Sequence, residues 1–494
     1  MKSTQAKFGF KHKSGILMAV SSLPSRYGIG SVGAPAFKFI DFLKECKQRV
    51  WQVLPLNPTA YGDSPYQSPC SFAGNPYFVD LDVLKKEFLL CEEDLEGAID
   101  NGDRVDYGKL FETRIPLLKR AYSKFLPTPK YTRFAEKNAD WLDDYALFMT
   151  LKEKNDYKSW TEWGDMREYA FAKAHESEFA QECGFWKFVQ FEFFSQWKKV
   201  REYAKKNGIS IVGDMPIYVA YDSVEVWRAP NEFLLDEKLV PTVVAGCPPD
   251  AFSDDGQLWG NPIYDWKRMK ENGYRWWVER AKHVFELYDI VRIDHFRGFA
   301  GYYVIPYGDE TAKGGHWETG VGYELFAEIE KAVPKAKIIA EDLGHITDDV
   351  RELLEKTGYP GMKVLQFAFN DKKNEYLPRN YKTDNCVVYT GTHDSASTKA
   401  WLSDMTDVEK KAFERECPVR FGQSPTAALV AFAMNSPANL AVIPLQDYME
   451  LGAEARMNIP STAQGNWTWR ASGRFATTAL KNKITTITEN SDRA

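Results

Sequence analysis

The sequence has few of the features that assign a chain to a specialised class. Its seven cysteines are scattered singly with no CxxC pair, and its seven histidines form no HExxH motif. This pattern argues against a disulfide framework or a thiolate metal site and is typical of a reducing compartment. No apolar run approaches the length of a membrane span, and the first residues lack the apolar core of a secretory signal. The formal net charge is −6 without a long basic run, so neither nucleic acid nor a membrane is expected as a partner.

What the sequence does contain is the composition of an ordinary globular protein with many aromatic rings. Of its 494 residues, 44% are hydrophobic and 27% are charged, with both signs mixed along the chain. This length suffices for two or three small domains or for one large domain. The aromatic content is 14%, with fifteen tryptophans. Most of these rings are expected in the core, but sugar-binding proteins also use flat rings that stack on pyranose faces.

Short apolar, β-branched segments alternate with helical patterns along most of the chain. The segments predicted as strands are 15–24, 49–57, 209–219, 289–298, 336–344, 361–369, 386–394 and 440–448. Amphipathic helices are predicted at 274–288, 322–333 and 348–358. Repeated alternation of strands and helices predicts an α/β fold, a (β/α)8 TIM barrel.

Two stretches are too long to be single connections of a barrel. Residues 77–207 contain several helical patterns, and we interpret them as a mainly helical insertion subdomain. Residues 222–268 are rich in Pro, Gly, Asp and Trp, and we interpret them as a second insertion, an ordered loop. Residues 1–481 are otherwise predicted as a single barrel, and the polar tail 482–494 is expected to fray.

One apolar strand carries several charged groups, in the sequence IVRIDHFRGF (290–299). Val291 and Ile293 share one face of the strand, and Arg292 and Asp294 share the other. Buried charge is costly unless it is paired or used. In a barrel this second face points inward at the C-terminal mouth, where barrel enzymes place their sites.

Other predicted strands end in similar groups. These groups are Asp214, Glu341, Asp342, His393 and Asp394. Several carboxylates at one mouth, with an arginine and two histidines, fit chemistry at an electron-poor sugar carbon. In retaining glycoside chemistry one carboxylate attacks and a second donates a proton, with the two about 5–5.5 Å apart.

The two carboxylates of such a pair need different protonation states. Arg292 should keep Asp294 ionised for attack, and neighbouring carboxylates should raise the pKa of Glu341, which suits a proton donor. A strand-end acid can instead cap a helix or pair with a basic residue, and this interpretation is favoured for Asp214 and Asp342 taken singly. A divalent metal held by the carboxylates is a further alternative, against which the neighbouring Arg and His side chains argue.

The motifs RIDHFRG, AEDLG and GTHD, in this order, resemble the signatures of the 4-α-glucanotransferases, also called amylomaltases or disproportionating enzymes. This family is the transferase branch of the α-amylase-like barrel enzymes. Further segments that resemble it are SSLPSRYGIGSVG (21–33), WQVLPLNPT (51–59), DSPYQSPCSFAGNPY (63–77), GDMPIYV (213–219), PPDAFSDDGQLWGNP (248–262) and NIPSTAQGNWTWR (458–470). The resemblance covers nearly the whole chain. It implies transfer of α-1,4-glucan segments between malto-oligosaccharides or glucans derived from starch or glycogen.

Carried over residue by residue, the resemblance implies that Asp294 is the nucleophile that forms a covalent glucosyl–enzyme intermediate. It implies that Glu341 is the general acid and then the base, and that Asp394 holds ring hydroxyls and favours an oxocarbenium-like transition state. The residues implied to hold the sugar next to the scissile bond are Arg292, His393 and Asp214. Those implied to line the glucan groove, partly within the 222–268 insertion, are Tyr61, Gln257, Trp259 and Asn458. No metal or organic cofactor is implied.

The chain departs from the family pattern at two places. Ser395-Ala396-Ser397-Thr398 follows GTHD where Asn-Asp-Thr-Thr is expected, and Ser461 follows NIP where Gly is expected. These changes leave the three carboxylates intact and bear on acceptor preference and loop shape. Transfer also requires that a sugar hydroxyl reach the intermediate before water does. The candidates for excluding water and binding the acceptor are the loop 61–66 and the segment 246–262.

Two other functions remain open at this point. An α-glucan hydrolase would use the same residues, release free glucose and raise the number of reducing ends. A non-catalytic glucan-binding protein on a decayed barrel would bind without turnover, and the intact carboxylates argue against it. The lack of a targeting segment indicates a bacterial cytoplasm, with a processed plastid enzyme as the alternative.

Overall fold

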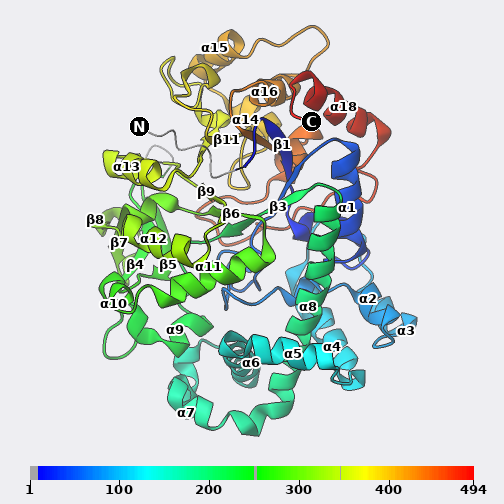
Figure 1. The fold of residues 1–494 in the computed structure, drawn as a ribbon, viewed down its shortest axis with the longest axis vertical. Helices are drawn as coiled ribbons and strands as arrows, with labels where there is room; N and C mark the ends of the chain where they lie inside the picture. Colours follow the sequence, from blue (N-terminus) through cyan, green and yellow to red (C-terminus); the bar gives the residue numbers. More distant parts are fainter. Residues whose placement is uncertain (1–8, 250–252, 345) are drawn as a thin grey trace.

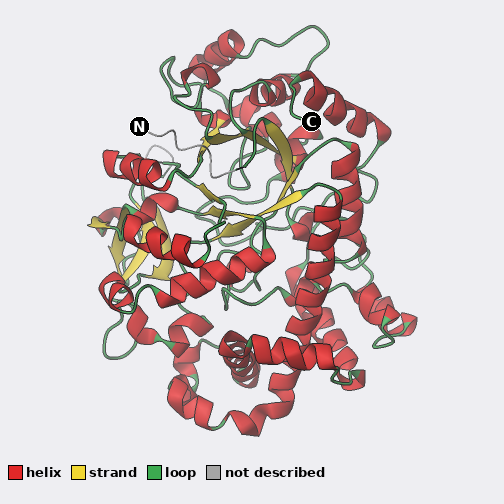
Figure 2. Ribbon diagram, in the orientation of Figure 1, coloured by secondary structure: helices red, strands yellow, loops and turns green. Residues whose placement is uncertain are grey.

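Eight parallel strands close into a barrel at the centre of the protein (Figures 1 and 2). The computed structural model describes residues 9–249, 253–344 and 346–494. Around the barrel the strand order is β1-β12-β11-β10-β9-β6-β3-β2. The strands are β1 (Lys13–Leu17), β2 (Val50–Gln52), β3 (Ser210–Met215), β6 (Ile290–Ile293), β9 (Ile338–Ala340), β10 (Gly361–Val364), β11 (Cys386–Tyr389) and β12 (Leu440–Pro444). Seven of them lie within segments predicted as strands, and β1 begins two residues before the predicted segment 15–24, so the predicted (β/α)8 fold class is confirmed.

The register of the barrel brings the charged strand ends together. Strand β6 lies between β3 and β9, with Asp214 opposite Arg292 and Ile293 opposite Ala340. The backbone N–H of Asp294 continues the pairing by donating to the carbonyl of Met215 at 3.0 Å. All four residues of β6 are buried, with Val291 and Ile293 on one face of the strand and Arg292 on the other, toward the barrel mouth. The next residues of β6 and β9, Asp294 and Glu341, therefore emerge side by side.

A layer of helices surrounds the barrel. It includes α1 (Ala34–Glu45), α8 (Ala180–Lys206), α11 (Arg275–Leu287), α12 (Tyr323–Ala332), α13 (Asp348–Thr357), α14 (Thr398–Asp404) and α16 (Pro425–Met434). Helix α15 (Asp407–Glu416) lies farther from the barrel, at the top of Figure 1. The helices predicted at 274–288, 322–333 and 348–358 correspond to α11, α12 and α13. In α11 the side chains of Trp277, Ala281 and Val284 are buried on one face. No helix in the described part of the chain combines the length and the hydropathy needed to cross a membrane.

Between β2 and β3 the described chain is helical. The helices before α8 are α2 (Leu81–Lys86), α3 (Glu92–Leu95), α4 (Tyr107–Lys124), α5 (Pro129–Lys137), α6 (Ala139–Lys154) and α7 (Tyr169–Ala174). Helix α8 contacts α1, α11 and β3, so it takes part in the layer around the barrel. It also contacts α4, α5 and α6, which lie away from the barrel (Figure 1). The bounds of a helical insertion subdomain at 77–207 stay a prediction.

A second, antiparallel sheet flanks the barrel in the order β5-β4-β7-β8. Its strands are β4 (Val243–Cys247), β5 (Gln257–Pro262), β7 (Gly301–Pro306) and β8 (His316–Thr319). The interpretation of 222–268 as a loop is therefore wrong in conformation, because this segment also contains α9 (Val224–Arg228) and α10 (Trp266–Glu271). Strand β4 pairs with β7, which is distant in sequence, so no local pattern marked the sheet. A role of 222–268 in glucan binding stays a prediction.

The end of the chain is ordered rather than frayed. Helix α18 (Thr478–Asn490) packs against α1 and α16, and Ile484 is completely buried. Beyond the helix, the buried guanidinium of Arg493 donates hydrogen bonds to four backbone carbonyls, those of Met434, Ser436, Ala438 and Lys13. The expectation that the tail 482–494 frays is wrong, because this one arginine fastens it to the barrel.

Candidate active site

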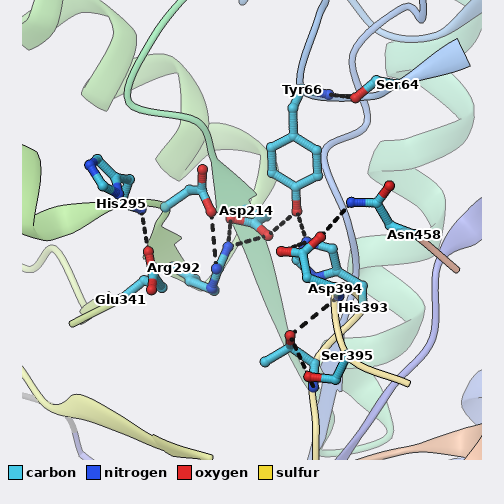
Figure 3. A network of polar contacts seen from close by, with 12 residues as sticks. Ser64, Tyr66, Asp214, Arg292, His295, Glu341, His393, Asp394, Ser395 and Asn458 are labelled. Carbon is cyan, nitrogen blue, oxygen red and sulfur yellow. Dashed lines mark hydrogen bonds and ion pairs between the residues drawn. The ribbon is translucent and has the colours of Figure 1, made fainter. Parts of the chain in front are cut away.

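Arg292 is the centre of a charge network at the C-terminal mouth of the barrel (Figure 3). Its Nη1 donates to both oxygens of Asp214 at 2.7 Å, and its Nη2 lies 3.0 Å from Oδ1 of Asp294. The side chains of Arg292 and Asp214 are 4% and 0% exposed, whereas that of Asp294 is 25% exposed. The buried arginine thus has two carboxylate partners, and Asp294 is the most exposed of the three.

Tyr66 joins this network from the loop after β2, and the sequence interpretation missed it. Its hydroxyl lies 2.8 Å from Oδ2 of Asp214, to which it donates, and 2.8 Å from Nε2 of His393. Its ring is nearly parallel to the imidazole, with centroids 5.3 Å apart. Tyr66 was part of the quoted segment DSPYQSPCSFAGNPY, but only its loop was considered for function. A flat ring beside the carboxylates is the surface that a pyranose needs.

Asp394 is surrounded by side-chain donors. Asn458 Nδ2 donates to Oδ1 at 2.7 Å, and His393 Nε2 lies 3.2 Å from Oδ2. Burial by itself raises the pKa of Asp394, but the imidazole and the amide outweigh it and hold the pKa well below its usual range. In the same way burial lowers the pKa of His393, and the Asp394 carboxylate reverses the shift to a net rise. Asp394 is therefore expected to be ionised near neutral pH.

Glu341 is held by backbone donors instead. The N–H of His295 donates to Oε2 at 2.6 Å, and the N–H of Leu343 donates to Oε1 at 3.1 Å. His295 has a φ of 49°, in the left-handed region, which turns its backbone toward Glu341. Burial raises the pKa of Glu341, although the charge of Arg292 and the two N–H groups lower it. The expected rise in this pKa is present, and its main cause is burial.

The protonation expected for Asp294 requires a correction. Burial raises its pKa to about 7, with the charge of Arg292 acting in the opposite direction. Burial, together with the negative charge of Asp214, outweighs the charge of Arg292, so Arg292 does not keep Asp294 fully ionised. The charge of Glu341 also raises the pKa of Asp294. Both carboxyls therefore keep a proton to higher pH than exposed carboxyls do, and an attacking carboxylate and a proton donor need one of the two ionised and the other protonated.

The groove residues expected from sequence are only partly described. Gln257 Oε1 accepts a hydrogen bond from Trp259 Nε1 at 3.0 Å, and the indole meets the His295 ring edge-on at 4.8 Å. These three side chains extend the site beyond Glu341, and His295 is a second residue that the sequence interpretation did not select. Its Nε2 is buried without a partner in the described part of the chain. The side chain of Tyr61 and the residues 250–252 lie outside the described structure.

The remaining predicted or alternative groups have ordinary partners. Asp342 accepts a hydrogen bond from the N–H of Met362 at 2.6 Å, so it neither caps a helix nor adds to the mouth network. Ser395 Oγ accepts from the N–H of Thr392, and Ser461 has a φ of 65°, a conformation that favours glycine. Among the described residues no group of three His, Cys, Asp or Glu side chains is arranged to hold a metal ion.

Known proteins match this chain over almost its full length. A family model described as 4-alpha-glucanotransferase, of glycoside hydrolase family 77, matches residues 18–477. The 4-alpha-glucanotransferase of Clostridium butyricum is 45% identical over 485 residues, which cover 95% of this chain and 99% of that protein. That of Streptococcus pneumoniae is 45% identical over 488 residues, covering 97% of both.

Solved structures agree with the sequence matches. The amylomaltase from Streptococcus agalactiae in complex with acarbose superposes with a TM-score of 0.94 at 38% identity, covering 98% of this chain and 100% of that chain. The motifs that resemble this family lie at the strand ends that converge on Arg292. The chain belongs to the 4-alpha-glucanotransferase family.

Proposed function

We propose that Asp294, Glu341 and Asp394 carry out the 4-α-glucanotransferase reaction on α-1,4-glucans by a retaining double displacement. The observation that carries this proposal is the position of Asp294 and Glu341, which directly follow the paired strands β6 and β9 at the barrel mouth. The pair lies beside Asp394, which is held ionised by His393 and Asn458. Such a site has a nucleophile, a proton donor and a fixed negative charge.

In the first step a carboxylate oxygen of Asp294 attacks the anomeric carbon of the donor glucan. The glycosidic bond breaks, and its electron pair stays on the leaving oxygen, which takes the proton of Glu341. In the second step Glu341 removes the proton from the 4-hydroxyl of an acceptor glucan. The acceptor oxygen bonds to the anomeric carbon, and the ester to Asp294 breaks. The two inversions retain the α configuration.

The groups around Arg292 support the reacting sugar in this scheme. Asp214, Arg292 and His393 are proposed to bind its hydroxyl groups, and the ring of Tyr66 offers a face on which the pyranose stacks. Asp394 stabilises positive charge that develops at the anomeric carbon. Because each of these groups is fixed by another before substrate arrives, little reorganisation is needed in the transition state.

The side of the site beyond Glu341 is proposed to bind the acceptor. Trp259 and Gln257 belong to the edge strand β5, and Trp259 packs on His295. Tyr61 and Asn458 are kept as groove residues, and the substrates proposed are malto-oligosaccharides and glucans from starch or glycogen. All seven cysteines are free thiols, which agrees with a reducing compartment such as the cytoplasm.

The test is incubation of the purified protein with maltotriose, following glucose, the distribution of chain lengths and total reducing ends together. Transfer predicts glucose and a ladder of longer glucans at a constant number of reducing ends. A rising number of reducing ends means that water takes the glucosyl group, and the site is then a hydrolase. An unchanged maltotriose peak from folded protein contradicts both activities and supports a binding protein.

A further inference from the structure

Asp447 is a buried carboxylate behind the site that the proposed mechanism does not use. It lies on the short helix α17 (Leu445–Tyr448), directly after β12, and is 1% exposed. Burial raises its pKa, and the groups that oppose this shift are hydrogen-bond donors rather than cations. A buried carboxylate without a cation must be stabilised by donors, so its partners show what it holds.

Two threonines supply those donors. Thr390 Oγ1 donates to Oδ2 at 2.5 Å, Thr398 Oγ1 donates to the same oxygen at 2.6 Å, and the N–H of Thr398 donates to Oδ1 at 2.7 Å. Thr390 and Thr398 are both completely buried. Hydrogen bonds to an ionised acceptor are short and strong, so the carboxylate ties these two points of the chain firmly together.

The two threonines lie at the two ends of the loop that carries His393 and Asp394. Thr390 directly follows β11, and Thr398 is the first residue of α14. His393 and Asp394 lie between them, on the loop that crosses the barrel mouth. Asp447 follows the neighbouring strand β12, so its contacts fix this loop to the rigid barrel from outside the loop itself.

We propose that Asp447 is a positioning residue of the transfer reaction, which clamps both ends of the loop 390–398 and so places His393 and Asp394 against the reacting sugar. This inference rests on the proposed function, because Asp447 acts only through those two residues. A displacement of about 1 Å in a catalytic group costs up to about 100-fold in rate. Loosening either end of the loop is a way to produce such a displacement without touching the substrate.

The principal variant is Asp447→Asn, which keeps the shape but removes the charge. Its amide can accept from the Thr398 N–H but must direct its NH₂ at the two hydroxyls, so the clamp is rearranged. We expect kcat for maltotriose disproportionation to fall about 10- to 100-fold. The KM is expected to change less than about 3-fold, because the lost interactions act mainly in the transition state.

The matched control is Asp80→Asn. Asp80 is also a buried aspartate, 3% exposed, and accepts hydrogen bonds from Ser31 Oγ at 2.6 Å and from the N–H of Val83 at 3.2 Å. It lies at the start of α2 and touches no residue of the site. A similar fall in melting temperature is expected for both variants, with kcat of the control within about 2-fold of the parent.

A second pair of variants keeps the carboxylate. Thr398→Val preserves the side-chain shape and removes the hydroxyl, whereas Thr398→Ser restores the hydroxyl and loses only a methyl group. We expect the valine variant to lose kcat and the serine variant to retain it within about 2-fold. If Asp447→Asn does not fold, the double variant Thr390→Val with Thr398→Val supplies the same measurement.

Asp394→Asn, measured in parallel, separates this inference from the proposed function. If that variant keeps turnover, the role of Asp394 is wrong and the positioning role falls with it. If it is inactive while Asp447→Asn behaves like Asp80→Asn, the proposed function stands and Asp447 is only structural. Equal activity of the valine and serine variants at position 398 also overturns the inference.

Discussion

The two sides of the barrel mouth hold their carboxylates in opposite ways. On the right of Figure 3, Asp394 is bound by the side chains of His393 and Asn458, and its pKa is held low. On the left, Glu341 is bound by backbone N–H groups, and burial raises its pKa. Side-chain partners are thus concentrated on Asp394, which is proposed to stay charged. Burial dominates at Glu341, which is proposed to exchange a proton.

Arg292 stands between the two sides and explains why they differ. A single guanidinium serves both Asp214 and Asp294, and Asp214 takes a hydrogen bond from it on each oxygen. The attraction between Arg292 and Asp294 does not offset the cost of burying the Asp294 carboxylate, so the pKa of Asp294 rises to about 7. The comparison teaches that an arginine adjacent in sequence does not set the charge of a carboxylate until all of its partners are counted.

The largest effect is expected from Asp294→Asn, which removes the nucleophile from the proton-exchanging side. Loss of a covalent nucleophile should lower kcat by at least about 10⁴-fold. Disproportionation of maltotriose measures it. The control is Asp289→Asn at the other end of β6, where Asp289 accepts a hydrogen bond from the N–H of Ile211 and pairs with Arg201. Comparable losses in both variants would mean that damage to β6, rather than the chemistry, is being measured.

Glu341→Gln should have the next largest effect. A positioned proton donor contributes about 10²- to 10⁴-fold, so transfer from maltotriose should fall by that range. A donor with a fluoride leaving group, such as α-maltosyl fluoride, needs little help from an acid. Formation of the glucosyl intermediate from this donor, followed as fluoride release, should be nearly normal in the variant. An equal loss with both donors contradicts the role of Glu341 as the acid.

Tyr66→Phe tests the side that holds charge in place. The change removes one hydroxyl that bonds both Asp214 and His393, and leaves buried polar groups unsatisfied. A cost of about 1–2 kcal/mol, or about 10-fold in kcat/KM, is expected. Tyr264→Phe is the matched control, because Tyr264 is buried and its hydroxyl donates to the carbonyl of Ile217 at 2.8 Å and interacts with Arg280, away from the catalytic carboxylates. An effect of the same size there would remove the special role of Tyr66.

The pH dependence of kcat/KM should arise from Asp294 and Glu341 and not from Asp394. Activity requires one proton on the pair of Asp294 and Glu341, so kcat/KM should fall when the pair gains a second proton on the acidic side. It should fall again when the pair loses its last proton on the basic side. Asp394, with its lowered pKa, stays ionised across this range. Asn458→Ala should therefore reduce kcat only a few-fold and leave the acidic and basic falls of the pH profile at the same pH. If the acidic fall shifts in this variant, it reports the titration of Asp394 instead.

Particular elements show which parts of the fold can be read from the chain. The eight barrel strands are runs of β-branched residues that end in polar groups, and such a local pattern survives in any packing. Strand β4 has a similar run, but it pairs with β7, and β6 lies between these two strands in the sequence. A local sequence pattern cannot identify so distant a partner. The tail beyond α18 is polar in composition, and only the carbonyls that surround Arg493 make it part of the core.

The sequence by itself determined the barrel, the family and the presence of three carboxylates just beyond the ends of barrel strands. It did so because strand periodicity and motif order are properties of the chain. Only the tertiary structure decided the charge of Asp294 and the place of Tyr66. The first depends on burial and on the charges of Asp214 and Arg292, and the second on a loop that folds back over β3 and β11. Proton affinity is set by burial and by all partners in space, and those partners are far apart in the chain.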